Sequence, residues 1–318
     1  MKLMLRYALL IVVSFALINV LAAQDTGGKK KKKRGKKDEP ELPVVSQGLL
    51  DSISGNLVWV TGGSFIMGNR SGDADEKPEY EVVVDGFAIS KYPVTQRQWT
   101  AIMGSNPSEF VGCNQCPIDR VSWDDAQRFI ETLNKLSGKK YALPTEAEWE
   151  YAAKGGPKTQ GYRYSGSDNI DDVAWHTGNS NRQPHPVGEK APNELGLYDM
   201  SGNLWEWCQD WYNKNYYELR ERNNPTGPAS GSGRVRRGGS WFTQAANCKT
   251  STRNSVKQDY KDDSGGFRQN LGPVLCHPQA LDRRLLCRRG SRWAARSVRD
   301  SSRALGCHGG GSRRTAHL

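Results

Sequence analysis

The stretch Gly196–Trp207 (GLYDMSGNLWEW) decides the fold of this chain, together with three shorter motifs around it. They are Ala142–Tyr151 (ALPTEAEWEY), Arg237–Trp241 (RGGSW) and Gly266–Arg268 (GFR). The central stretch places a small turn directly before two tryptophans, whose side chains bury a large apolar area. All four motifs lie in the same part of the chain, which predicts one packed domain there.

Three helices are predicted from the residues that would cap their first turns. Thr95, Ser122 and Thr145 are each followed, three residues later, by a side chain that can bond back to the cap. This is the capping-box pattern, and the first two helices should each end at a glycine. We interpret Glu146 and Glu148 as capping residues at the positive end of the third helix, not as a general acid–base pair.

Strand signals are shorter. Trp59-Val60 and Phe65–Met67 flank a pair of glycines, and Glu81–Asp85 alternates between apolar and polar residues before Phe87–Ile89. Asp85-Gly86 between these last two runs is typical of a hairpin turn, so we expect the runs to pair with each other.

Beyond Gly155 the chain is rich in glycine, asparagine, serine and proline and shows little periodicity. Eight of its ten tryptophans nevertheless lie between Trp99 and Trp241. Tryptophan side chains bury a large apolar area, so the loops that carry them should pack as part of the domain. We predict an α+β fold that is irregular and loop-rich.

The order and spacing of the four motifs resemble those of the formylglycine-generating (sulfatase-modifying) enzyme family. The resemblance covers roughly residues 56 to 268. It implies the fold of that family, a variant of the C-type-lectin-like architecture. It also implies the activity of the catalytic members, which are metal-dependent oxidases that modify a cysteine of an exported protein.

A calcium site is the first feature that the resemblance implies. Carried over residue by residue, the ligands would be the Asp199 side chain, the carbonyls of Gly202 and Leu204, and an oxygen of Glu206. Calcium takes six to eight oxygens of this kind. The alternative is a buried turn without a metal ion.

The catalytic cysteine pair is incomplete. Copper-dependent members of the family carry two cysteines where this chain has Thr243 and Cys248, and a hydroxyl does not replace a thiolate on Cu(I). We therefore do not expect copper to bind. If the protein were an oxidase all the same, Cys248 and Ser240 would be its candidate catalytic residues.

The domain contains four cysteines, which allows three disulfide pairings in an oxidising compartment. We hypothesise the pairs Cys113–Cys116 and Cys208–Cys248. Cys113 and Cys116 could also form a redox motif, but no helix start follows them to stabilise a thiolate. The state of Cys248 separates the functional hypotheses: a disulfide would favour a binding module, and a free thiol would favour an oxidase.

Residues 1–23 have the pattern of a secretory signal peptide, with an apolar run, Tyr7–Leu21, before two small residues. The alternative is a retained membrane anchor. We expect a bacterial protein that is secreted, periplasmic or on the cell surface, with no transmembrane anchor after cleavage. Residues 24–48 include a dense lysine run and should form a disordered linker.

The formal charge of +11 belongs to the two ends of the chain, because residues 49–268 are mildly acidic. A nucleic-acid partner is therefore not expected. Residues 269–318 contain arginine but no lysine, and we interpret them as a tail that is out of frame and has lost the closing strand. The alternative is an arginine-rich binding tail.

Residues 49–268 are thus expected to form a sulfatase-modifying-factor-like domain without the usual catalytic pair. The first functional hypothesis is a non-catalytic or divergent member that binds a protein or a glycan at the cell surface. The alternative is an oxidase of the formylglycine-generating type. A fold resemblance alone does not decide between them.

Overall fold

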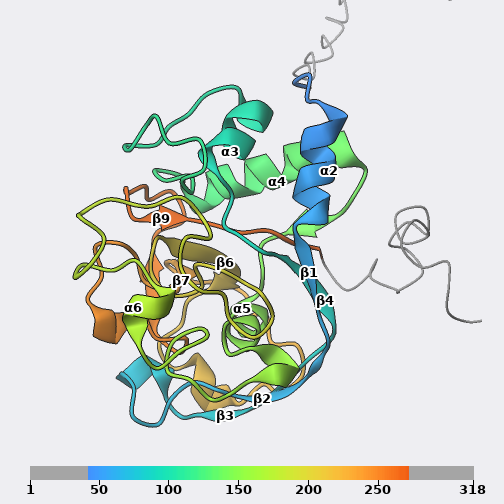
Figure 1. Ribbon diagram of the computed structural model, residues 1–318. Coiled ribbons are helices and arrows are strands. Elements are labelled where there is room, and N and C mark those ends of the chain that lie inside the picture. Colours follow the sequence, from blue (N-terminus) through green and yellow to red (C-terminus); the bar gives the residue numbers. More distant parts are fainter. Residues whose placement is uncertain (1–41, 272–318) are drawn as a thin grey trace, which may run out of the picture. The chain divides into compact units, whose positions relative to one another are not determined.

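The computed structural model describes residues 42–271, which form an α+β domain (Figure 1). The predicted fold class is confirmed, because short helices and strands alternate with long irregular loops. The predicted signal peptide, most of the lysine-rich linker and the arginine-rich tail lie outside the described residues.

The three predicted helices are present, and their capping boxes are formed. They are α3 (Gln96–Met103), α4 (Trp123–Ser137) and α5 (Glu146–Ala153). A further helix, α2 (Gln47–Gly55), lies near α4 at one end of the domain (Figure 1). The shorter elements are α6 (Ile170–Val173) and the 3-10 turns η1 (Ala74–Glu76), η2 (Gly156–Lys158), η3 (Tyr216–Leu219) and η4 (Ala245–Asn247). Within residues 42–271, none of these helices combines the length and the apolar character needed to span a bilayer.

One antiparallel sheet has the strand order β1-β4-β10-β5. Its strands are β1 (Leu57–Val60), β4 (Phe87–Ser90), β10 (Asn270–Leu271) and β5 (Tyr141–Ala142). Strand β10 pairs with β4 on one side and with β5 on the other. The folded domain therefore continues past residue 268, and the expectation that the closing strand is lost is wrong.

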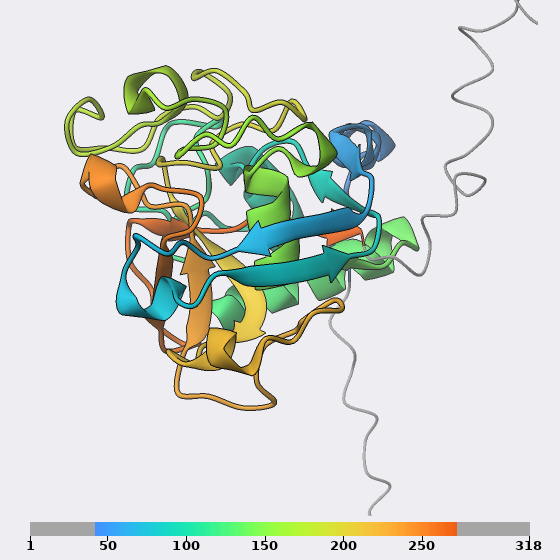
Figure 2. The same cartoon turned by 90° about the horizontal axis from the view of Figure 1, so that it is seen from below.

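A second sheet contains only β2 (Gly63–Met67) and β3 (Tyr80–Val84), which lie side by side in Figure 2. The predicted hairpin of β3 with β4 is wrong, because β4 pairs with β1 instead. The reason lies at Gly62 and Gly86, whose backbones touch: a Cβ on Gly62 would be 2.6 Å from the Gly86 nitrogen. These glycines let two paired chains turn together from one sheet into the other.

The third sheet has the order β8-β7-β6-β9. Its strands are β6 (Trp205–Trp211), β7 (Arg234–Arg237), β8 (Arg253–Val256) and β9 (Gly265–Gly266). Only the β6–β9 pair is parallel. Helix α5 contacts β2 and β3 as well as β6 and β7, so it lies between two sheets (Figure 1).

Helix α5 carries buried charge, which corrects the interpretation of Glu146 as a cap alone. Arg253 binds both carboxylate oxygens of Glu146, at 2.7 and 2.8 Å. Arg237, which is fully buried, bonds to Glu150 and lies 3.4 Å from Glu146. Lys154 also bonds to Glu150, at 2.6 Å. Buried ions need such partners, so these contacts fix β7 and β8 against the helix.

Candidate functional site

The turn before β6 has the tight geometry that its sequence predicts. Asp199, Gly202 and Asn203 all have positive φ angles, of 57°, 74° and 62°. A Cβ on Gly202 would lie 2.2 Å from the Trp175 carbonyl oxygen, so only glycine fits there. The Asn203 side chain exchanges two hydrogen bonds of 3.1 Å with the backbone of His185. The turn is therefore fixed against the preceding loop.

Glu206, one of the predicted calcium ligands, lies in a buried hydrogen-bond network. Its carboxylate accepts hydrogen bonds from Arg268, at 2.5 and 2.6 Å, and from the Trp149 indole, at 2.7 Å. Both carboxylate oxygens thus accept hydrogen bonds from buried donors, one at Oε1 and two at Oε2. The structural reason is that the GFR motif lies beside β6, which spacing along the chain does not reveal.

Asp199 lies in the interior, where only 3 % of it is exposed. It accepts hydrogen bonds from the Gly188 amide at 2.8 Å and from Asn203 at 3.3 Å. Burial raises the pKa of its carboxyl to about 6. Within residues 42–271 no three His, Cys, Asp or Glu side chains are grouped to hold a metal ion. A calcium ion here would therefore depend on one carboxylate and on the carbonyls of Gly202 and Leu204, which are hard oxygen ligands of the kind calcium takes.

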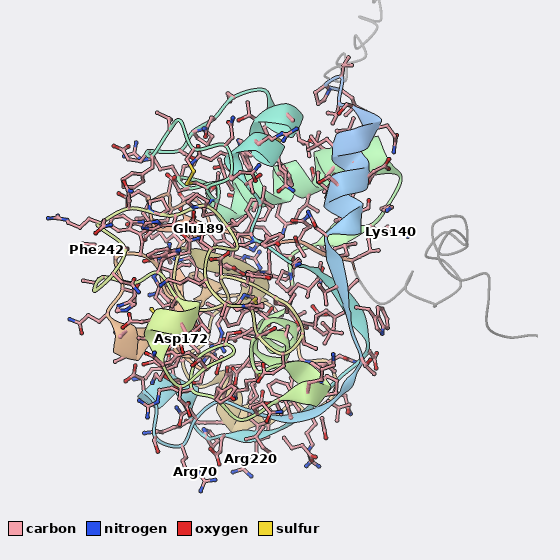
Figure 3. All side chains as sticks on the ribbon, viewed as in Figure 1. Arg70, Lys140, Asp172, Glu189, Arg220 and Phe242 are labelled. Carbon is pink, nitrogen blue, oxygen red and sulfur yellow. A yellow bond between two sulfur atoms is a disulfide. The ribbon has the colours of Figure 1, made fainter. Side chains whose placement is uncertain are left out.

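The structure brings Ser240, Thr243 and Cys248 together after β7. The Ser240 amide donates to Thr243 Oγ1 at 3.0 Å, and the two hydroxyl oxygens lie 2.9 Å apart. A Cβ on Gly239 would be 2.6 Å from the Cys248 sulfur, so this glycine makes room for the thiol. Phe242, which lies between Ser240 and Thr243 in the chain, is 63 % exposed at the edge of the molecule (Figure 3).

Cys248 is a free, buried thiol. Burial raises its pKa to about 12, and the Ser240 amide, which lies against the sulfur, lowers it only in part. The thiol donates to the Gln244 carbonyl, with 3.7 Å between sulfur and oxygen. Such a group is protonated at neutral pH and is a weak nucleophile.

The cysteine pairing differs from the hypothesis in one of its two bonds. Cys113 and Cys116 form a disulfide. Cys208 and Cys248 are free, so the predicted bond between them is wrong. Cys208 packs in the apolar core beside α5, whereas Cys248 belongs to a separate cluster with Tyr164. An even number of cysteines cannot show which of them are neighbours in space.

Asp119 is a buried carboxyl that the sequence did not single out. Its Oδ1 accepts from the Glu109 amide at 2.7 Å, while its Oδ2 is buried without a hydrogen-bond partner in the described part of the chain. Burial raises its pKa to about 6, and the negative charge of Asp263 adds to the shift. No sequence pattern marks an aspartate in a loop as buried.

This environment predicts how Asp119 affects the pH dependence of folding. The carboxyl has a pKa of about 6 in the folded protein and about 3.9 when unfolded. Ionisation therefore lowers stability as pH rises from 4 to 6. We expect Asp119→Asn to gain about 2 kcal/mol at pH 7.5, with a gain that shrinks toward pH 4. Urea unfolding at pH 7.5 and 4.5 measures this gain in the free energy of unfolding. The control is Asp259→Asn, at an exposed position. An equal gain at both pH values would contradict the assignment.

The comparisons with known proteins agree with the motifs. The sequence model of the sulfatase-modifying factor enzyme 1-like domain matches residues 51–270. A protein named chaperone protein LppX, from Paenibacillus barcinonensis, is 36 % identical over 245 residues, which cover 60 % of this chain and 80 % of that protein. The formylglycine-generating enzyme of Streptomyces coelicolor is 36 % identical over 178 residues, covering 51 % and 54 %.

Other relatives are longer proteins. The serine/threonine-protein kinase pkn1 of Chlamydia caviae is 32 % identical over 239 residues, covering 67 % of this chain but only 37 % of the kinase. Among solved structures, Treponema denticola variable protein 1 superimposes with a TM-score of 0.64 at 29 % identity, covering 68 % of this chain and 95 % of that protein. Proteins with quite different names thus share this domain.

Proposed function

This chain belongs to the sulfatase-modifying factor family, and from that membership we propose that it is a binding module exported from a bacterial cell. The observation that carries the proposal is Thr243 beside Cys248, where the catalytic relatives have two cysteines. Family membership alone leaves the question open, because one relative is named a chaperone and another an enzyme.

The chemistry of the Ser240 cluster supports a non-catalytic role. A threonine hydroxyl is a poor ligand for Cu(I), which prefers soft thiolates. The remaining thiol has a pKa of about 12, so it would give up its proton to a metal only at a high cost. The domain is rich in irregular loops, which suit recognition of a protein or a glycan.

One observation favours the alternative, a metal-dependent oxidase that modifies a cysteine of an exported protein. Cys248 is a free thiol and not half of a disulfide. The Ser240 amide lies near its sulfur and also donates to Thr243 Oγ1 at 3.0 Å. A single cysteine is nevertheless an incomplete ligand set for copper.

An oxygen-consumption assay tests the proposal against this alternative. The purified chain is supplied with Cu(I) and a cysteine-containing peptide, while oxygen uptake and the peptide mass are followed. We expect neither oxygen uptake nor conversion of the cysteine. Turnover that is lost in Cys248→Ser would replace the binding module with the oxidase. Export is tested in parallel by fractionation, with the mature N-terminus near residue 23.

We further propose that calcium binds at Asp199 and the carbonyls that follow it. The buried carboxylate would gain a positive partner, which should stabilise the folded state. At a calcium concentration about 100 times the dissociation constant, the gain is about 2.7 kcal/mol, or a rise of roughly 5 to 10 °C in melting temperature. Differential scanning calorimetry with calcium, magnesium or EDTA measures it. A shift that survives in Asp199→Ala would place the ion elsewhere, and no shift would remove calcium from the proposal.

A further inference from the structure

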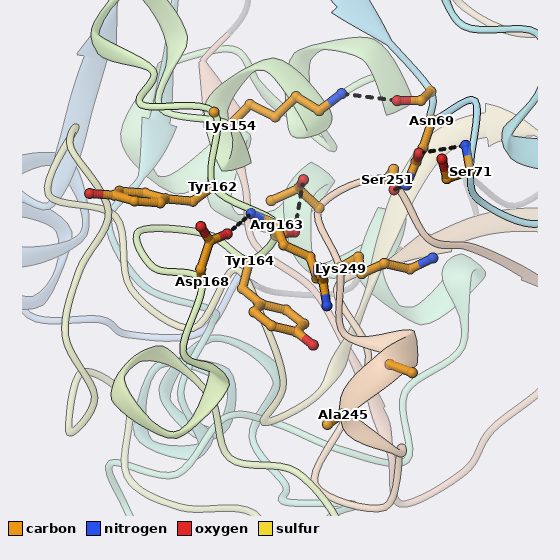
Figure 4. Close-up of a pocket in the computed structure, with 14 residues that line it drawn as sticks. Asn69, Ser71, Lys154, Tyr162, Arg163, Tyr164, Asp168, Ala245, Lys249 and Ser251 are labelled. Atoms are coloured by element: carbon orange, nitrogen blue, oxygen red, sulfur yellow. Dashed lines mark hydrogen bonds between the residues drawn. The ribbon is translucent and has the colours of Figure 1, made fainter.

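A pocket of about 850 Å³ opens on the side of the domain that carries η4 (Figure 4). Its wall comes from the loop after β2, from the end of α5, from the loop before α6 and from the segment around η4. The residues that the argument uses are Asn69, Lys154, Tyr162, Arg163, Lys249 and Ser251. Neither Asp199 nor Cys248 lines it, but Tyr164, which packs in one cluster with Cys248, does, so the pocket adjoins the Cys248 region.

Arg163 presents a free guanidinium to this pocket. Its amide donates to Asp168 Oδ1 at 2.8 Å, and its carbonyl accepts from the Thr250 amide at 3.1 Å. Within residues 42–271 the guanidinium itself has no hydrogen bond or ion pair. The backbone is therefore fixed while five N–H donors remain available, an arrangement suited to oxyanions such as carboxylate or sulfate.

Two lysines add positive charge to the same wall. Lys154 shares the buried Glu150 with Arg237, so that one carboxylate faces two cations. Lys249 lies 3.3 Å from Glu76, which is also bonded to Ser251. The charged side chains that line the pocket are thus the cations Lys154, Arg163 and Lys249 and one acid, Asp168. The two lysines already have carboxylate partners, so the Arg163 guanidinium is the cation that an anionic ligand would pair with.

The rest of the lining favours a sugar over a bare anion. Asn69 and Ser71 bring an amide and a hydroxyl group that match sugar hydroxyls, whereas the buried hydroxyls of Thr250 and Ser251 already bond to the Arg163 carbonyl and to Glu76. The Tyr162 ring is 38 % exposed and offers an aromatic face for a sugar ring. A single inorganic anion would fill only a small part of this volume. We propose that the pocket binds an acidic oligosaccharide, with its carboxylate or sulfate on Arg163. This inference rests on the proposed binding function and names its ligand class.

Isothermal titration of the whole chain with trigalacturonate tests the inference. We expect saturable binding that weakens with added salt, and no binding of the carboxyl-reduced, neutral trisaccharide. Arg163→Gln should weaken binding about tenfold, because one charge-assisted contact is lost. Lys249→Gln is an independent second variant. The matched control is Arg97→Gln, which removes the same charge from an exposed position on α3 outside the pocket.

Several outcomes would overturn the inference. They are equal binding of the neutral sugar, equal binding of an octaglutamate peptide, no binding of the acid, or an Arg163→Gln variant that binds like Arg97→Gln. In each case the binding-module proposal stands as long as the oxygen assay shows no turnover. Oxidase turnover would instead remove that proposal whatever the titration shows, so the two failures are distinguishable.

Discussion

Arg268→Met is expected to lose about 3 to 5 kcal/mol of folding stability, because it leaves the buried Glu206 without its cation. Arg268 is fully buried and binds both carboxylate oxygens of Glu206, the Ser90 carbonyl at 3.0 Å and the Tyr198 carbonyl at 2.8 Å. It therefore links β4, the turn that follows Tyr198, and β6. The loss is a large part of the stability of a typical domain, so most of the variant should unfold in mild urea.

A double variant separates the uncompensated charge from the lost packing. Adding Glu206→Gln to Arg268→Met removes the charge and keeps an acceptor for the Trp149 indole, so we expect recovery of about 2 kcal/mol. Arg268→Lys should fall between the wild type and Arg268→Met, because lysine keeps the charge but loses the bidentate geometry. The measurement is urea unfolding followed by tryptophan fluorescence. An additive double variant would contradict the role given to the ion pair.

Thr243→Cys is expected to bind Cu(I) at least about 100-fold more tightly than the wild type, because it supplies a second soft ligand beside Cys248. The geometry on which this rests is the shared amide: Ser240 N–H donates to Thr243 Oγ1 at 3.0 Å and also lies against the Cys248 sulfur. Competition with a Cu(I) chelator of known affinity measures the change.

Two controls accompany this variant. Thr243→Ser keeps a hydroxyl at the same place and should leave copper affinity unchanged. Thr243→Cys combined with Cys248→Ser should fall back to the wild-type value, since a pair of thiolates is needed. If the single variant gains no affinity, the two positions are too far apart for one copper ion.

The buried ion pairs hold the scaffold together without the Ser240 cluster. Arg237, Arg253 and Arg268 all pair with carboxylates inside the domain, and none of these contacts involves Thr243 or Cys248. The loops are therefore held together by residues other than Thr243 and Cys248. This separation allows the surface to carry a new specificity without a loss of the fold.

The three capped helices and the α+β class could be predicted from the sequence, because they depend on residues close together in the chain. Thr95, Ser122 and Thr145 each bond to an amide three residues away. Contacts of this range leave a readable pattern. The missing thiolate at Thr243 could also be recognised from the order of the motifs alone.

The sequence by itself thus determined the family, the helix starts and the incomplete catalytic pair. Only the tertiary structure decided that β4 pairs with β1, that Cys208 and Cys248 lie in separate apolar clusters, and that Glu206 forms an ion pair with Arg268. It also decided that Arg163 lines the same pocket as Lys249, which lies 86 positions further along the chain. Such pairings join residues far apart in the chain, and they are selected by packing and by the cost of burying unpaired charge, which no local spacing records.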